Sequence, residues 1–113
     1  MEIATTFPIP DAAVIAIDGE MDLYNANQLR EAFQQALTDS RRGIVLELSR
    51  LRYLDSSGVG VLIHMIQSLK SRKGRLAVVG LHGSPEKVLT MTNIIALLKR
   101  FSTCEEAVAY ITE

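Results

Sequence analysis

Two kinds of apolar pattern alternate along this chain, and their alternation constrains the fold more than any other feature. Short apolar and β-branched runs, typical of strands, lie at residues 2–7, 14–17, 44–48, 76–80 and 98–101. Segments whose apolar residues recur at helical spacing lie at 26–37, 59–69, 84–91 and 105–111. The order ββαβαβαβα requires a sheet with parallel strand pairs covered by about four helices, not a bundle or a sandwich. We therefore predict an α/β fold with a mixed sheet.

Residues typical of turns and helix ends support this order. Pro8 and Pro10 bracket a turn, so the first two strands are predicted to form an antiparallel hairpin. Asp22 and Asn25 are alternative caps for the first helix. Ser84, followed by a proline and a glutamate, predicts the start of the third helix, with the serine as its cap.

Length, composition and charge exclude several classes of protein. The chain has 113 residues and is 48% hydrophobic, which predicts one domain over 1–113, with a core but no deep cofactor chamber. A net charge of −1 gives no basis for nonspecific nucleic-acid binding. The longest strongly apolar run, 59–66, is too short to span a membrane, and the first residues lack a signal-peptide pattern. We therefore expect a cytoplasmic protein with no cofactor.

The single cysteine, Cys104, limits thiol chemistry. One cysteine forms neither an internal disulfide nor a multi-thiolate metal site, so we expect no metal centre of that kind. We expect Cys104 to be a small packing residue near the last helix.

Charge is distributed unevenly along the chain. Residues 1–56 hold nine acids and five bases, whereas residues 57–113 hold four acids and seven bases. The acidic stretch around Asp18, Glu20 and Asp22 has two interpretations. It is ordinary surface charge, or it meets a basic surface on a partner.

The sequence Asp55-Ser56-Ser57-Gly58-Val59-Gly60 joins a strand region to a helix start, where backbone amides are unpaired and the helix dipole is positive. One interpretation is structural: Ser56 or Ser57 caps the helix, and the glycines allow close packing. Another is regulatory, because a phosphoserine at a helix N-terminus need not unfold the domain. Its added charge, placed about 6 Å from a carboxylate of a partner, opposes binding by on the order of 2–5 kcal/mol.

A nucleophilic serine is a third interpretation of the same motif. It requires a base within hydrogen-bond reach of the hydroxyl and an oxyanion hole. His64 lies two helical turns onward and His82 follows another strand, so neither is positioned by its spacing. The G-x-S-x-G elbow is absent, since Leu54 stands two residues before Ser56 and Asp55 stands two residues before Ser57.

Phosphate chemistry on a nucleotide or on an aspartate is a fourth interpretation. The third glycine of the dinucleotide fingerprint is replaced by Ile63, and no G-K-[ST] follows for a P-loop. A receiver-like domain would use Asp55 as the phosphoacceptor, with the acidic stretch near residues 18–22 holding magnesium. Against it, Asp55 lies seven residues beyond the predicted strand end at Leu48, and Lys99 is the sole candidate for a late lysine on a strand.

The stretch from Leu54 to Leu62 resembles the signature of the STAS domain of bacterial anti-sigma factor antagonists. The resemblance covers essentially the whole chain. It includes the sequence Gly19-Glu20-Met21-Asp22 before a helix, the strand 44–48, and Gly80 followed by Ser84-Pro85-Glu86-Lys87-Val88. Leucine usually occupies the position of Val59 in that family, a departure that leaves the serine unaffected.

The resemblance implies a partner-switching cycle in transcription regulation. The unphosphorylated protein would bind an anti-sigma factor with serine kinase activity and free a sigma factor. Phosphorylation of Ser56 would inactivate it, and a metal-dependent serine phosphatase would restore it. The chain would then be a monomeric substrate, not an enzyme, and would contact neither nucleic acid nor membrane. A STAS module of another bacterial complex, such as a stress-signalling assembly or a lipid-transport system, is the alternative.

The resemblance also implies a partner-binding surface that contains Asp22, Asp55, Ser56, Ser57 and Gly58. Two roles stay open for Asp55: it presents the serine to a kinase, or it stabilises the turn. His64 is expected to be solvated, since it falls on the polar side of its helix. Two roles also stay open for the arginines at positions 50 and 52: they contact a phosphate, or they keep the surface soluble.

Overall fold

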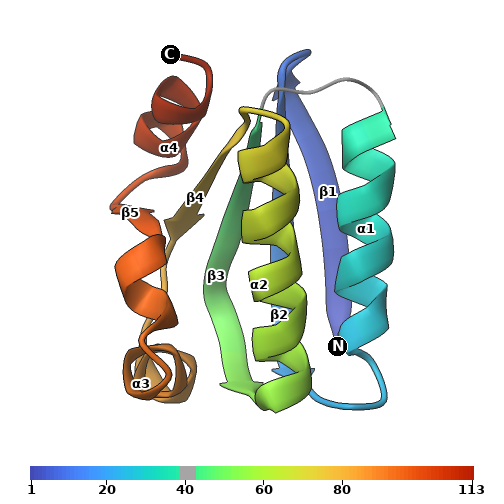
Figure 1. Ribbon diagram of the computed structural model, residues 1–113, viewed down its shortest axis with the longest axis vertical. Helices are drawn as coiled ribbons and strands as arrows, with labels where there is room; N and C mark the ends of the chain where they lie inside the picture. The colour runs from blue at the N-terminus through green and yellow to red at the C-terminus, as the bar shows by residue number, and fades with distance from the viewer. Residues whose placement is uncertain (39–42) are drawn as a thin grey trace.

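The computed structural model describes residues 1–38 and 43–113, and its centre is a five-stranded sheet (Figure 1). The strands are β1 (Glu2–Ile9), β2 (Ala12–Met21), β3 (Gly43–Leu54), β4 (Arg75–Val79) and β5 (Lys99–Phe101). They lie in the order β1-β2-β3-β4-β5, with β1 antiparallel to β2 and all other neighbours parallel. The predicted hairpin and mixed sheet are confirmed.

The helices complete the predicted order ββαβαβαβα in the described residues. They are α1 (Ala26–Thr38), α2 (Ser56–Ser71), α3 (Gly83–Met91) and α4 (Cys104–Ile111), with a short 3-10 helix, η1 (Ile94–Leu97), before β5. Helices α1 and α2 lie side by side on one face of the sheet (Figure 1). Helix α4 packs on the other face, over β3 and β4.

Strand alternation divides the apolar side chains between two cores. The larger core joins α1 and α2 to the sheet and includes Ile15, Phe33, Leu46 and Met65, all fully buried. Burying each of these side chains contributes roughly 1.5–3 kcal/mol. The smaller core lies under α4 and consists of Ala12, Val45, Ala77, Val79, Ala107 and Ile111.

β3 extends six residues beyond the predicted end at Leu48. The pairing of β2 with β3 shifts register between Ala16 and Asp18, and again between Gly19 and Glu20. Such irregularities leave consecutive residues on the outer side, so the period-two alternation used for the prediction stops before the strand does. The extended strand brings Asp55 directly to the sheet edge.

The start of α3 differs from the prediction. His82, rather than Ser84, occupies the cap position, and its side chain makes no capping hydrogen bond. Gly83 has φ +63°, a left-handed conformation that glycine adopts without strain, and it turns the chain into the helix. The sequence pattern missed this turn because the serine and the proline after it form a typical helix start by themselves.

Candidate functional site

The predicted site residues lie at one edge of the sheet, where β2 and β3 both end. The loop after β2 (residues 22–25) and the first turn of α2 meet there, at the lower end of Figure 1. The amide of Asp55 donates to the carbonyl of Met21 at 3.2 Å, so the two strand ends are tied by a backbone hydrogen bond. Parallel strands produce this meeting, because their carboxyl ends share an edge.

Asp55 caps α2 and also holds the loop of the neighbouring strand. Its Oδ1 accepts from the amides of Ser57 at 2.9 Å and Gly58 at 3.3 Å. Its Oδ2 accepts from the amide of Leu23 at 3.1 Å, across 32 positions of sequence. The cap is therefore this carboxylate, not a serine hydroxyl. Of the two roles left open for Asp55, the turn-stabilising one is present in the structure.

Ser56 is the first residue of α2 and is exposed, whereas Ser57 is half-buried. Within the part of the chain that the structure describes, the Ser56 hydroxyl makes no hydrogen bond. Capping by Asp55 leaves this hydroxyl available to solvent. Of the two serines, Ser56 is the more exposed to solvent.

Asp22 shapes the loop and does not cap α1. Its Oδ1 accepts from the amide of Tyr24 at 2.9 Å, upstream of the helix. Asn25 closes the loop from the other side, because its Oδ1 accepts from the Asp22 amide and its Nδ2 donates to the carbonyl of Glu20, both at 2.9 Å. The predicted capping of α1 by either side chain is replaced by an Asx turn, which holds the loop in one conformation.

Gly58 lies beneath the site, buried against the ends of β2 and β3. A Cβ atom there would collide with the Leu54 side chain and would lie 2.9 Å from the Met21 sulfur. Glycine therefore allows the first turn of α2 to approach the sheet closely. In contrast, a Cβ at Gly60 meets nothing within 4 Å, so that glycine has no packing requirement.

Two exposed apolar residues beside the predicted site were not identified from the sequence. Leu23 is 71% exposed and Tyr24 is 92% exposed, both on the loop that Asp22 and Asn25 fix. Large apolar side chains held outward by an ordered loop are typical of an interaction surface. The available signal was their position directly after the acidic stretch, outside any helical or strand periodicity.

The histidines and arginines are engaged elsewhere. The ring of His64 packs edge-on against Phe33 with centroids 6.1 Å apart, so this residue is half-buried rather than fully solvated as predicted. His82 Nε2 lies 2.8 Å from the carbonyl of Ser49. Arg50 and Arg52 pair with Asp18 at 3.7 and 3.2 Å. None of these contacts builds a serine–histidine pair.

The described residues contain no group of three or more His, Cys, Asp or Glu side chains placed to hold a metal ion. The acidic residues around the end of β2 are already used within the chain, since Asp18 pairs with two arginines and Asp22 accepts from a loop amide. The geometry therefore does not assemble the carboxylate cluster that a receiver-like magnesium site requires.

Sequence and structure comparisons agree on one family. The STAS domain model matches residues 5–107. The chain belongs to the STAS domain family. An anti-sigma-B factor antagonist of Listeria monocytogenes is 30% identical to this STAS protein over 87 residues, or 75% of each chain.

Solved structures share its fold. The crystal structure of TM1081 from Thermotoga maritima matches with a TM-score of 0.87 and 24% identity, covering 98% of this chain and 95% of that one. The phosphorylated form of the Bacillus cell fate determinant SpoIIAA matches with a TM-score of 0.77 and 23% identity, covering 97% of this chain and 99% of the other. At this identity the two structures establish the common fold. Among the described residues of this STAS protein, no helix is both long and apolar enough to cross a membrane.

Proposed function

We propose that this STAS protein is an anti-sigma factor antagonist controlled at Ser56. In its unphosphorylated form it binds an anti-sigma factor that has serine kinase activity, and thereby frees a sigma factor for transcription. Phosphorylation of Ser56 ends the complex, and a metal-dependent serine phosphatase restores it. The observation that carries this proposal is the exposed Ser56 hydroxyl at the first turn of a helix capped by its neighbour Asp55.

The proposed binding surface combines the predicted residues with the apolar pair on the neighbouring loop. Asp22, Asp55, Ser56 and Ser57 line the edge at which β2 and β3 end, and the loop beside them displays Leu23 and Tyr24. Buried Gly58 contributes by setting the position of the turn and not by direct contact. An apolar centre bordered by polar groups is a common composition of protein interfaces.

The proposed switch is electrostatic. A phosphoserine adds about −1.5 to −2 charges beside the existing carboxylate of Asp55. Against a partner carboxylate about 6 Å away, the repulsion is on the order of 2–5 kcal/mol, and 1.4 kcal/mol corresponds to a factor of ten in affinity. The complex is therefore expected to weaken by about thirtyfold or more. In this cycle the chain acts as a monomeric, cytoplasmic substrate of the kinase and needs no cofactor of its own.

The test is recovery of partners by the full chain and two variants, Ser56→Ala and Ser56→Asp. We expect wild type and Ser56→Ala to retain an ATP-binding kinase-like protein, and Ser56→Asp to lose it. Ser71→Asp is the matched control, because it places the same charge on an exposed serine at the other end of α2. Equal recovery by wild type and Ser56→Asp, or equal loss by both aspartate variants, would refute a switch at this serine.

The identity of the phosphorylated residue has its own chemical test. After incubation with the purified partner and ATP, phosphate on Ser56 should survive acid. An acyl phosphate on Asp55 would hydrolyse quickly at alkaline pH and would support the receiver-like alternative. Mass spectrometry that places phosphate on Ser57 alone would move the site by one residue and contradict the assignment to Ser56.

A further inference from the structure

The two faces of the sheet are covered to different extents. Helices α1 and α2 together cover one face, whereas α4 is the described helix that packs on the other (Figure 1). Neighbouring strands lie about 4.8 Å apart and a helix is about 10 Å across, so five strands have room for two helices side by side. The part of the second face formed by β1 and by β2 beyond its buried start at Ala12, next to α4, is not covered by a described helix. We call this region the open face.

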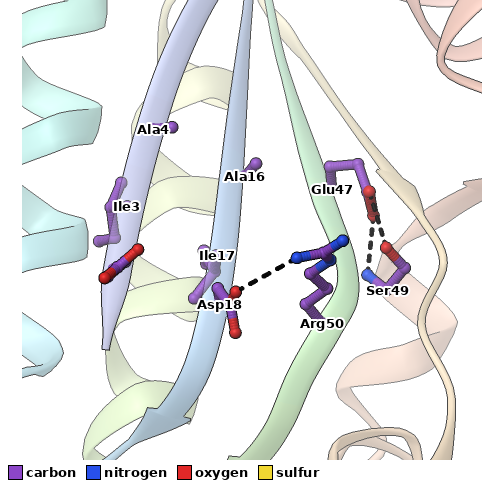
Figure 2. A pocket seen from close by; sticks show the side chains of 9 residues that line it. Ile3, Ala4, Ala16, Ile17, Asp18, Glu47, Ser49 and Arg50 are labelled. Carbon is purple, nitrogen blue, oxygen red and sulfur yellow. Dashed lines mark hydrogen bonds and ion pairs between the residues drawn. The ribbon is translucent and has the colours of Figure 1, made fainter.

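Two adjoining hollows run along the open face. One, of about 340 Å³, lies over the start of β1, the second half of β2 and residues 47–50 of β3, and Figure 2 shows Ala4 and Ala16 among its lining residues. The other, of about 430 Å³, lies between β1, Val14 of β2 and Val108 of α4. Ala4 pairs with Ala16, and Thr6 pairs with Val14 two positions along, so the two hollows follow one another along the same strands.

The floor of the open face has the same chemistry as the sheet beneath α4. Where α4 packs, Ala107 and Ile111 meet two alanines and two valines of the strands, Ala12, Ala77, Val45 and Val79. Beside α4, the cross-strand pair of Ala4 and Ala16 is similarly small. Small residues on a strand let the apolar side chains of a helix approach the sheet. The open face therefore has the shape that a second helix, beside α4, would fill.

The border of the open face is acidic. Two carboxylates, of Glu2 and Asp18, stand directly opposite each other in the pairing of β1 with β2, a like-charge arrangement that is unfavourable across strands. The described residues lining the two hollows include four carboxylates, on Glu2, Asp18, Glu47 and Glu105, and one cation, on Arg50. A ligand that brings positive charge would relieve this excess.

Two of these carboxylates lie towards α4: Glu47 lines the first hollow and Glu105 lines the second. Glu47 is oriented by Ser49, whose amide and hydroxyl donate to it at 2.7 and 2.8 Å, as Figure 2 shows. Burial raises the pKa of the nearby Cys104 thiol, and the charges of Glu47 and Glu105 raise it further. Both acids therefore lie near the wall formed by α4. Asp18 is partly neutralised, since it pairs with Arg52 at 3.2 Å and with Arg50 at 3.7 Å.

We propose that the open face binds a basic amphipathic helix supplied by a partner protein. Its apolar stripe lies over Ala4, Ala16 and Val14, beside α4, and lysines or arginines on its flanks reach the carboxylates of Glu2 and Glu47. The surface is separate from Ser56, which begins a helix packed on the opposite face. A second copy of this chain is a poorer occupant, because α1, α2 and α4 turn their apolar stripes towards their own sheet.

The first experiment uses a synthetic helical peptide of about 14 residues, or four turns, with a leucine stripe flanked by lysines. The control peptide has glutamate in place of each lysine. Both are titrated into the full ¹⁵N-labelled chain. We expect the lysine peptide to shift the amides of β1 and β2 around Ala4 and Ala16, and the glutamate peptide to leave them unchanged.

Variants then locate the binding site. Ala4→Arg places a large cation on an exposed floor position, and Glu2→Lys reverses one charge of the border. Each substitution should lower the affinity for the lysine peptide by about tenfold, or 1.4 kcal/mol. Gln67→Arg, on the exposed side of α2, is the control and should leave affinity unchanged. Ser56→Asp should also leave it unchanged, which separates this proposal from the one at Ser56.

Several results would overturn the proposal. They are equal binding of the two peptides, no binding of either, shifts confined to the edge around Ser56, and undiminished affinity in both Ala4→Arg and Glu2→Lys. A concentration-dependent dimer that protects the β1 amides without peptide would assign the open face to a second copy instead.

Discussion

Replacing Asp55 separates its two structural roles. In Asp55→Ala the amides of Ser57 and Gly58 lose their cap, which costs about 1 kcal/mol, and the Leu23 amide loses its acceptor, which costs about 1 kcal/mol more. Asp55→Asn keeps an oxygen that caps α2, but its second position becomes an amide donor and no longer accepts from Leu23. We therefore expect losses of about 2 kcal/mol for alanine and about 1 kcal/mol for asparagine in the free energy of unfolding.

Urea unfolding at neutral pH measures both losses, against a total stability of about 5–15 kcal/mol for a domain of this kind. Hydrogen exchange supplies a local measurement. The Leu23 amide should exchange faster in both variants, whereas the amides of the first turn of α2 should exchange faster in Asp55→Ala alone. Equal stability of the two variants would refute the separate cap. Unchanged exchange at Leu23 in both would refute the link between the loop and the helix.

Three further predictions test local features. Gly58→Ala should lower the free energy of unfolding in urea by about 1–3 kcal/mol, because its Cβ has no space beside Met21. Gly60→Ala should raise it by up to about 1 kcal/mol, because that Cβ meets nothing and alanine favours a helix. Equal effects of the two substitutions would refute the packing difference. Thr103→Ala removes the capping box of α4 and should lower stability by about 1 kcal/mol, and an unchanged urea midpoint would contradict this. The raised pKa of half-buried Cys104 should slow its alkylation by iodoacetamide at pH 8 relative to the unfolded chain, and equal rates would contradict the raised pKa.

Much of the fold is predictable because its signals are local. The apolar stripe of α1, with Leu29 and Phe33 buried as expected, specifies a helix and its inward face. Strand 44–48 was recognised from continuous apolar character, but its extension to Leu54 was missed because irregular pairing with β2 interrupts the alternation. Helix starts were less predictable. Serine, aspartate and asparagine are all good caps, and the choice between them depends on tertiary contacts.

For the site, the sequence alone located the motif Asp55-Ser56-Ser57-Gly58 at a strand-to-helix junction and the acidic stretch before α1, since both are contiguous in the chain. The tertiary structure decided how they act together. The hydrogen bond from the Leu23 amide to Asp55 spans 32 positions, and the exposure of Tyr24 depends on how the loop closes. The uncovered part of the sheet beside α4 is likewise a property of helix placement. Such features arise from contacts between distant segments, which leave no periodic pattern in the sequence, and so only the folded chain determines them.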